Sequence, residues 1–253
     1  MTENLKIQIK SLHKSFGNHH VLKGINLEVK KDSSLVILGG SGSGKSVLIK
    51  SIVGLITPDS GSILYDNKDS INISSKERLA ILENCGYLFQ AGALFDSLNI
   101  KENITFFAQK IYSLNKNDVT DLARSKLQSV GLPDRILNSY PSELSGGMQK
   151  RVALARAICT NPKIIFFDEP TTGLDPIMSN VINDLIIKIR EELGATTITI
   201  THDMESARKI AKEVAFLYDG KILWSDSINK MDKADNKYLQ QFITGSAKGV
   251  VTL

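Results

Sequence analysis

The stretch Gly39-Gly40-Ser41-Gly42-Ser43-Gly44-Lys45-Ser46 decides how this chain is interpreted, because it matches the glycine-rich pattern G-x-x-x-x-G-K-[ST]. An apolar run, 34–38, leads into it, and an amphipathic segment, 47–53, leads out of it before Gly54. A strand, a glycine loop and a helix in this order let backbone N–H groups and the helix dipole hold phosphate oxygens. The alternative, a flexible Gly/Ser linker, is disfavoured by the flanking strand and helix.

The polar side chains of this loop have distinct expected roles at a bound nucleotide. Lys45 is expected to reach the β- and γ-phosphates as a point charge, and the Ser46 hydroxyl to coordinate Mg²⁺. The sequence thus predicts a nucleotide-phosphate site at the start of the helix. Its predicted residues are Gly39, Gly40, Ser41, Gly42, Ser43, Gly44, Lys45, Ser46 and Val47.

Composition fits a globular enzyme. At 253 residues, with 42% hydrophobic and 23% charged residues, the chain is long enough for one large α/β domain or a core with an inserted subdomain. The formal net charge of +4 does not by itself indicate nucleic-acid binding. Cys85 and Cys159 lack metal-ligand spacing and are expected to be reduced thiols. With no signal-like N-terminus and no long apolar run, we expect any membrane role to depend on another chain.

Alternating apolar residues near the N-terminus predict short antiparallel strands beside the phosphate-loop core. They cover 7–9 and 21–29 and are separated by the turn-like Gly17-Asn18. Phe16, in the same region, has two readings: an aromatic that stacks on adenine, or a turn residue that caps the core. The nearby His13, His19 and His20 are expected to be solvated, because nothing beside them completes a metal site.

The middle of the chain predicts a strand followed by a helical insertion. Segment 87–95 begins as a core strand and continues with aromatic and small residues around Gln90. Taken alone, a glutamine at a strand end reads more readily as a surface residue than as a site residue. From Ile100 to about Val130 apolar residues recur at helical spacing, ending at Gly131. We therefore expect a helical subdomain to interrupt a mostly parallel sheet.

A second anion-binding surface is predicted at Leu144–Arg151. Ser145 is followed by two adjacent glycines, Gly146 and Gly147, which open a helix of small residues. The first N–H groups of such a helix suit an anion. One chain thus carries two predicted phosphate-binding surfaces.

A buried-strand pattern at 164–168 ends in the acids Asp168 and Glu169. Asp168 is expected to be a Mg²⁺ partner, and Glu169 to act as general base on the attacking water. Acids at a helix N-cap are the alternative, which the four preceding apolar residues and the following Pro170 disfavour.

The last third of the chain predicts a helix, a strand and a hairpin. Asp175 caps a helix that ends at Gly194. The strand at 195–200 ends near His202, which is either a γ-phosphate ligand or a structural histidine. Segment 214–224 is predicted to form a hairpin that turns at Asp219-Gly220.

The order of these motifs resembles the ATP-binding cassette of ABC transporters over nearly the whole chain. In that resemblance 39–46 is Walker A, Gln90 the Q-loop residue, 144–147 the signature motif, 165–168 Walker B, Glu169 the catalytic glutamate, 173–175 the D-loop, His202 the switch histidine and Phe16 the adenine-stacking aromatic. Met148 departs from the glutamine of many cassettes, although Ser145, Gly146 and Gly147 supply the phosphate contacts.

The resemblance implies a P-loop NTPase core with a mostly parallel sheet, an N-terminal antiparallel β-subdomain and an inserted α-helical subdomain. The implied parts are a core of about 1–90 and 160–228, a helical subdomain of about 91–159 and a tail of about 229–253. It further implies ATP and Mg²⁺, with Ser46, Gln90 and Asp168 at the metal and Asp175 at the nucleotide. Two copies are expected to pair head to tail, and segment 91–95 to dock on a membrane permease.

Finer details resemble the ATPase subunit of Mla-type transporters, which move phospholipid with MCE-domain proteins. They are Val47, segments 89–97 and 145–148, and the tail 238–249, although 250–253 departs from the Gly-Pro ending expected there. The resemblance implies a peripheral protein on the cytoplasmic face of a bacterial inner membrane. In the tail, Phe242 is either a dimer anchor or part of a frayed terminus.

Other functions stay open at this point. An ATPase subunit of an importer for amino acids or other small solutes is the first alternative, and segment 90–97 argues against it. A soluble ABC protein acting on DNA, ribosomes or Fe–S assembly is disfavoured by the single cassette, the lack of a long heptad insertion and the low net charge. A regulator without turnover is disfavoured because Glu169 and His202 are both present.

Overall fold

The computed structural model describes residues 4–246 and 248–250. The chain divides into two compact units: unit 1 holds the described residues up to Arg78 and from Thr196 onward, and unit 2 holds Leu79–Ala195. The boundary between them falls within α2 (Ser75–Glu83). The expected division by function into core, helical subdomain and tail stays a prediction.

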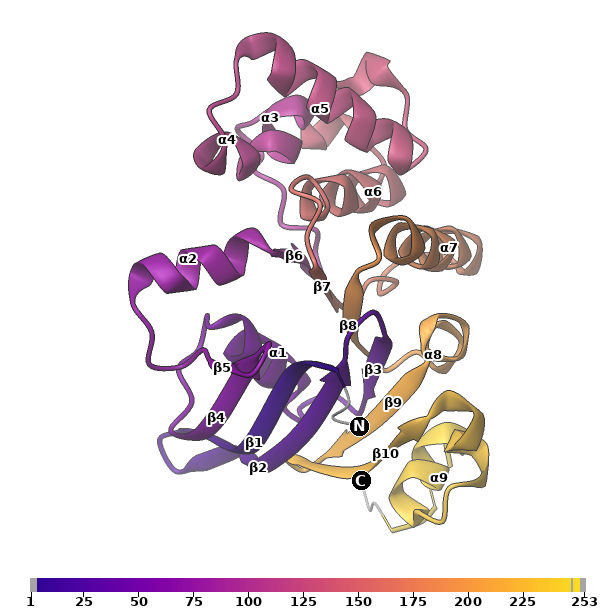
Figure 1. Ribbon diagram of the computed structural model, residues 1–253. Helices are drawn as coiled ribbons and strands as arrows, with labels where there is room; N and C mark the ends of the chain where they lie inside the picture. The colour runs from indigo at the N-terminus through magenta and orange to yellow at the C-terminus, as the bar shows by residue number, and fades with distance from the viewer. Residues whose placement is uncertain (1–3, 247, 251–253) are drawn as a thin grey trace. The chain divides into compact units, whose positions relative to one another are not determined.

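Unit 1 contains an antiparallel sheet with the strand order β2-β1-β4-β5 (Figure 1). Its central hairpin ends where Phe16 pairs with His19, and alternate residues such as Ile7 and Ile9 are buried. The predicted antiparallel sheet is therefore confirmed. Its strands are β1 (Leu5–Phe16), β2 (His19–Lys30), β4 (Ser60–Tyr65) and β5 (Lys68–Asp69).

Unit 1 also contains β3 (Ser34–Leu38), whose five residues are all buried and which pairs in parallel with β8 and β9. Leu38 lies opposite Thr201 of β8 and Phe216 of β9, so the loops that follow β3 and β8 leave from the same edge. β10 pairs antiparallel with β9, as the predicted hairpin requires. The remaining elements of unit 1 are β8 (Thr196–Thr201), β9 (Glu213–Tyr218), β10 (Lys221–Ser227), α1 (Lys45–Val53), α8 (Met204–Ile210), η3 (Ile228–Lys233) and α9 (Lys237–Thr244).

Unit 2 pairs β6 (Cys85–Leu88) in parallel with β7 (Ile164–Asp168), with Leu88 opposite Phe167. The predicted helical region follows β6, and its α3 packs against both α5 and α6 (Figure 1). The parallel strands and the inserted helices agree with the predicted fold class. The helices of this unit are α3 (Ile100–Thr105), α4 (Ala108–Ile111), α5 (Lys116–Ser129), η1 (Asp134–Ile136), η2 (Pro141–Glu143), α6 (Gly146–Ala157) and α7 (Pro176–Leu193).

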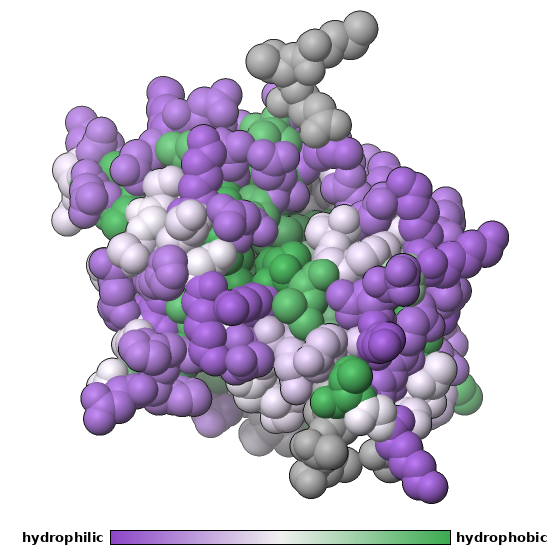
Figure 2. Space-filling model, turned by 90° about the horizontal axis from the view of Figure 1, so that it is seen from below, coloured by the Kyte–Doolittle hydropathy of each residue, from purple (hydrophilic) through white to green (hydrophobic). Residues whose placement is uncertain are grey.

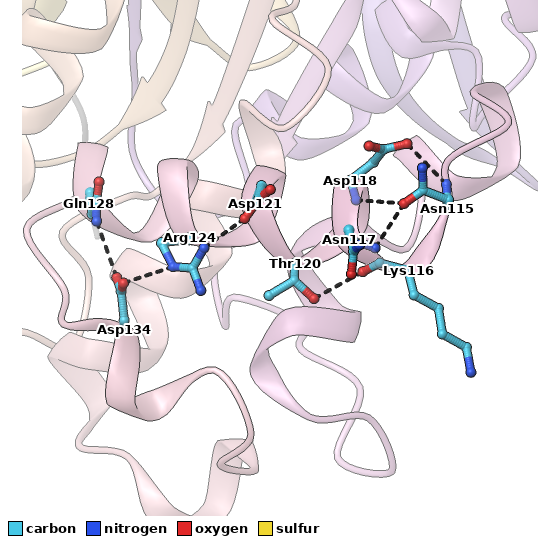
Figure 3. A network of polar contacts seen from close by, with 9 residues as sticks. All are labelled: Asn115, Lys116, Asn117, Asp118, Thr120, Asp121, Arg124, Gln128 and Asp134. Carbon is cyan, nitrogen blue, oxygen red and sulfur yellow. Dashed lines mark hydrogen bonds and ion pairs between the residues drawn. The ribbon is translucent and has the colours of Figure 1, made fainter.

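A polar network fixes both the start and the outer face of α5 (Figure 3). Asn115 and Asp118 form a capping box, in which each side chain accepts a hydrogen bond from the other's backbone N–H. Further along, Arg124 binds the carboxylates of Asp121 and Asp134. A capping box of this kind stabilises a helix by about 1 kcal/mol. It therefore helps to fix the residue at which α5 begins.

The C-terminal helix α9 packs on β9 of its own unit. The rings of Phe216 and Phe242 lie 5.4 Å apart, and those of Tyr218 and Tyr238 4.9 Å apart. Phe242 thus has an intramolecular partner, and its expected role as a dimer anchor stays a prediction. The parts of the predicted tail at Ala247 and Val251–Leu253 lie outside the described residues.

The face of the molecule in Figure 2 is mostly hydrophilic, with a small group of hydrophobic residues near its centre. Among the described residues, no helix combines the length and the apolar character needed to cross a bilayer.

Candidate functional site

The phosphate loop of unit 1 has a backbone that only glycine allows at key positions. Gly44 has a φ of 104°, and a Cβ there would lie 3.1 Å from the Val21 carbonyl oxygen. A Cβ at Gly39 would lie 2.3 Å from the Leu217 carbonyl oxygen. At Gly40 and Gly42, by contrast, no described atom lies within 4 Å of such a Cβ. The loop is therefore packed on one side and open on the other, as a cradle for phosphate requires.

Lys45 lies across this cradle. Its side chain is 8% exposed, and Nζ donates to the carbonyl oxygens of Gly39 (2.7 Å) and Gly40 (3.0 Å). The buried hydroxyl oxygen of Ser43 has no hydrogen-bond partner among the described residues. Ser46 is exposed at the second position of α1. A buried ammonium beside a cradle of N–H groups and hydroxyls fits a polyphosphate.

Two further predicted residues of unit 1 gather near this loop. His202 directly follows Thr201, which pairs with Leu38, so it leaves the sheet at the same edge as the phosphate loop. Phe16 is 50% exposed at the end of the β1–β2 hairpin, whose Val21 packs against the loop at Gly44. An exposed ring on a hairpin that packs against the phosphate loop is available for stacking on a base.

The predicted acids of unit 2 are buried and held by neighbouring hydroxyls. Asp168 and Glu169 are 6% and 7% exposed. The Tyr87 hydroxyl donates to Asp168 Oδ2 at 3.2 Å, and the Thr172 hydroxyl donates to Glu169 Oε2 at 3.1 Å. Burial, and then the charge of Asp168, raise the pKa of Tyr87 well above its usual range, so the phenol stays a donor.

Glu169 has a positive φ of 48°, which is rare for a residue with a Cβ. Such strain persists where the surroundings enforce it and is frequent at functional sites. The two adjacent acids have separate hydroxyl partners, Tyr87 for Asp168 and Thr172 for Glu169.

Gln90 follows β6, at the same edge of the β6–β7 pair as Asp168, because Leu88 lies opposite Phe167. Its side chain is exposed, whereas its carbonyl oxygen accepts a hydrogen bond from Lys150 Nζ. Arg156 donates to the carbonyl oxygens of Gly92 and Ala93 in the same loop. Sequence reasoning missed these two cations, and also Tyr87 and Thr172 as partners of the acids.

The second predicted anion surface is the N-terminus of α6. Ser145 is its N-cap, with the side chain accepting from Met148 N at 3.3 Å. Ser145 and Gly146 are exposed, and no described atom lies within 4 Å of a Cβ built on Gly146. A Cβ on Gly147 would lie 2.8 Å from Met178 Cε. The helix end is thus open to solvent at Ser145 and Gly146 and packed at Gly147.

Asp175 caps α7, where its carboxylate accepts from Met178 N at 2.9 Å. Because Met178 also lies against Gly147, the segments predicted to be the D-loop and the signature motif are neighbours within unit 2. Beside them, Ile177 is 76% exposed, the most exposed large hydrophobic residue in this region. An exposed apolar side chain next to an open helix N-terminus is compatible with a partner surface.

The predicted metal ligands supply oxygen atoms, which is what Mg²⁺ prefers. They are the hydroxyl of Ser46, the amide of Gln90 and the carboxylate of Asp168. Among the described residues no group of three or more His, Cys, Asp or Glu side chains could hold a metal ion. The hydroxyl, amide and carboxylate oxygens fit a hard cation that is also bound by phosphate oxygens.

The strand, glycine cradle and helix with a buried lysine define a P-loop nucleoside triphosphatase. Residues 22–172 match the family model for the ABC transporter, and the chain belongs to this family. It is accordingly an ATPase that binds ATP with Mg²⁺.

Proteins of similar sequence and structure support this family assignment. The chain is 37% identical to the intermembrane phospholipid transport system ATP-binding protein MlaF of Haemophilus influenzae, over 99% of this chain and 94% of that protein. It is 41% identical to the glutamate transport ATP-binding protein GluA of Corynebacterium glutamicum, over 86% and 88%. Among solved structures, the dimeric ATP-binding cassette MJ0796 bound to ADP and Pi superposes with a TM-score of 0.81 at 32% identity, over 88% of this chain and 98% of that one.

Proposed function

We propose that this chain is the ATP-hydrolysing subunit of a membrane transporter for phospholipid, and that two copies form its ATP sites head to tail. The main support for a paired site is the exposed N-terminus of α6 at Ser145 and Gly146. It offers a second anion-binding surface on a chain that already has a phosphate cradle at Lys45. In the proposed dimer the cradle of one copy faces the α6 N-terminus of the other.

In this proposal each residue has one task. Lys45 exchanges its two carbonyl partners for phosphate oxygens, and the loop N–H groups hold the rest of the charge. Ser46, Gln90 and Asp168 would hold Mg²⁺, which would supply positive charge to the phosphates. Glu169 Oε2 accepts a proton from the attacking water, and His202 donates to the γ-phosphate.

The γ-phosphate is the group that gives closure its driving force. It touches both the cradle and the partner's Ser145 surface, so ATP favours the closed pair and its hydrolysis removes that preference. The cassette MJ0796, which resembles this chain, is described as dimeric. Exposed Ile177, beside Gly147 and Met178, offers apolar area for such a contact.

The phospholipid assignment depends on how much of the chain each relative covers. The match to MlaF extends over 99% of this chain, whereas that to the glutamate transporter protein extends over 86%. We therefore place the protein at the cytoplasmic face of a bacterial inner membrane, peripherally, with permease subunits and an MCE-domain protein as partners. Segment 91–95 is the proposed docking surface on the permease.

The experiment is to purify the tagged full-length protein from detergent-solubilised membranes and to identify the proteins and lipids recovered with it. Phe95→Ala should weaken recovery of the permease while ATP binding is kept, because Phe95 is 43% exposed on the docking segment. Tyr112→Ala is the matched control, since Tyr112 is 44% exposed at the residue that caps the C-terminal end of α4. Recovery unchanged by Phe95→Ala would remove this segment from the interface.

The second candidate is the ATPase subunit of an importer for amino acids or other small solutes, favoured by the 41% identity to the glutamate transport protein. The same purification separates the two functions. A permease recovered with an MCE-domain protein and phospholipid supports the first, and one recovered with a soluble solute-binding protein supports the second. A preparation without any membrane partner would contradict both.

A further inference from the structure

The loop from Gln90 to Phe95 has an irregular backbone that needs support. Gly92 and Ala93 both have positive φ values, 74° and 50°, and the second is strained because alanine carries a Cβ. Left to itself, such a segment would sample many conformations. The described structure instead holds its backbone carbonyl oxygens with side chains from α6.

Lys150 and Arg156 of α6 supply this support. Lys150 Nζ donates to the carbonyl oxygen of Gln90. Arg156 donates to those of Gly92 (2.5 Å) and Ala93 (2.7 Å), and its guanidinium carbon lies 6.0 Å from the ring centroid of Phe95. Bonds from a charged donor are stronger than those between neutral groups. The loop is thus held by two cations on one rigid helix.

Burial makes the first of these bonds costly to lose. Lys150 is 6% exposed, although lysine is seldom so buried, and its ammonium is attracted by the carboxylates of Asp168 and Glu169. A buried charge of this kind is tolerated only with partners. The hydrogen bond from Lys150 to the Gln90 carbonyl oxygen therefore holds the loop beside the buried acids.

The far end of the loop is held by α3. Asn103 is fully buried; its Oδ1 accepts from Phe95 N at 2.8 Å, and its Nδ2 donates to the carbonyl oxygens of Phe95 (3.0 Å) and Leu98 (2.9 Å). The loop is anchored at this end independently of α6. Loss of the α6 cations should consequently loosen residues 90–94 and leave residues 95–99 in place.

We propose that Lys150 and Arg156 are positioning residues that join the Gln90–Phe95 loop to α6, so that the signature end of this helix and the loop move as one body. The consequence for transport rests on the proposed function, because that assigns ATP to the Ser145 end and the permease to the loop. The mechanical link itself does not, since it lies wholly within unit 2.

Hydrogen exchange on the full chain tests the link directly. In Lys150→Met and Arg156→Met, amides of 91–94 should exchange at least ~10-fold faster, while those of α6 and β7 keep their wild-type rates. Arg151→Met is the matched control on the same helix, because Arg151 donates to the Gly131 carbonyl oxygen at 3.1 Å and not to this loop. Unchanged exchange at 91–94, or the same acceleration in the control, would overturn the proposal.

Kinetics give a second readout that loss of folding would not mimic. Lys150→Met should lower kcat for ATP and leave KM within about twofold, because the cradle that binds phosphate is in unit 1. Lys150→Arg, which keeps a charged donor, should restore both kcat and slow exchange at 91–94. If Lys150→Met keeps the wild-type kcat and exchange, the positioning role is wrong; if the exchange result holds but no variant or wild type hydrolyses ATP, the proposed function fails and the link stands.

Discussion

The hydroxyl of Tyr87 donates a hydrogen bond to Asp168 Oδ2 across 3.2 Å, and Tyr87 lies against the ring of Phe166, 6.2 Å between centroids. The aromatic packing fixes the phenol, and the phenol fixes one oxygen of the acid that we assign to Mg²⁺. Groups that orient a metal ligand change metal affinity when they are removed.

Tyr87→Phe should therefore raise the Mg²⁺ concentration that gives half-maximal ATPase activity by about 10-fold, because the ring stays and only the hydroxyl is lost. A magnesium titration at fixed ATP measures this. Tyr112→Phe, at the exposed tyrosine that follows α4, is the control and should leave the titration unchanged. An unaltered midpoint in Tyr87→Phe would mean that Asp168 needs no orientation from the phenol.

Lys45→Ala should abolish tight ATP binding, since it removes the buried cation from the phosphate cradle. Fluorescent-nucleotide titration should show a loss of affinity of at least ~100-fold, as expected for a charged group that binds phosphate directly. Lys50→Ala, five positions further along α1, keeps the cradle intact and should bind as the wild type does. Affinity retained in Lys45→Ala would count against the phosphate-loop assignment.

Glu169→Gln should bind ATP and hydrolyse it at least ~100-fold more slowly, because glutamine cannot accept the proton of the attacking water. The measurement is a single-turnover assay that follows bound ATP and released phosphate separately. Glu191→Gln, at the exposed C-terminal end of α7, is the matched control and should turn over normally. Wild-type turnover in Glu169→Gln would assign the base elsewhere.

Cys159 should resist alkylation in the folded protein. It is 3% exposed, and burial raises the pKa of its thiol to about 11, although the charge of Lys126 acts in the opposite direction. At pH 8 almost none of it is the reactive thiolate. Iodoacetamide followed by peptide mass spectrometry should modify the half-buried Cys85 first and Cys159 only after denaturant is added. Rapid labelling of Cys159 under native conditions would contradict its burial.

The strands and long helices were predictable because each has a strong local signal. Four or more consecutive apolar residues predicted β3 and β7, and Asp175-Pro176 with Gly194 set the ends of α7. The sequence did not reveal α2, α8 or α9. None of the α2 residues is buried, so it lacks an apolar face, and α8 has only seven residues. Short or solvated helices depend on their surroundings more than on their own pattern.

The motif residues of the site were also predictable, but their supports were not. Lys150 and Asn103 are polar types that sequence reasoning places on the surface, yet both are buried. The partner of Lys150 is the Gln90 carbonyl oxygen, 60 positions away in the chain. A backbone acceptor at that distance leaves no trace in composition or periodicity, so only the three-dimensional structure reveals it.

The central claim is that ATP is clamped between two copies of this chain. Sedimentation velocity of Glu169→Gln tests it most directly, because this variant should bind ATP without consuming it. With MgATP its sedimentation coefficient should correspond to a dimer, twice the 27.8 kDa monomer mass. The double variant Glu169→Gln and Ser145→Arg should stay monomeric. A Glu169→Gln protein that binds ATP and remains a monomer would contradict the account.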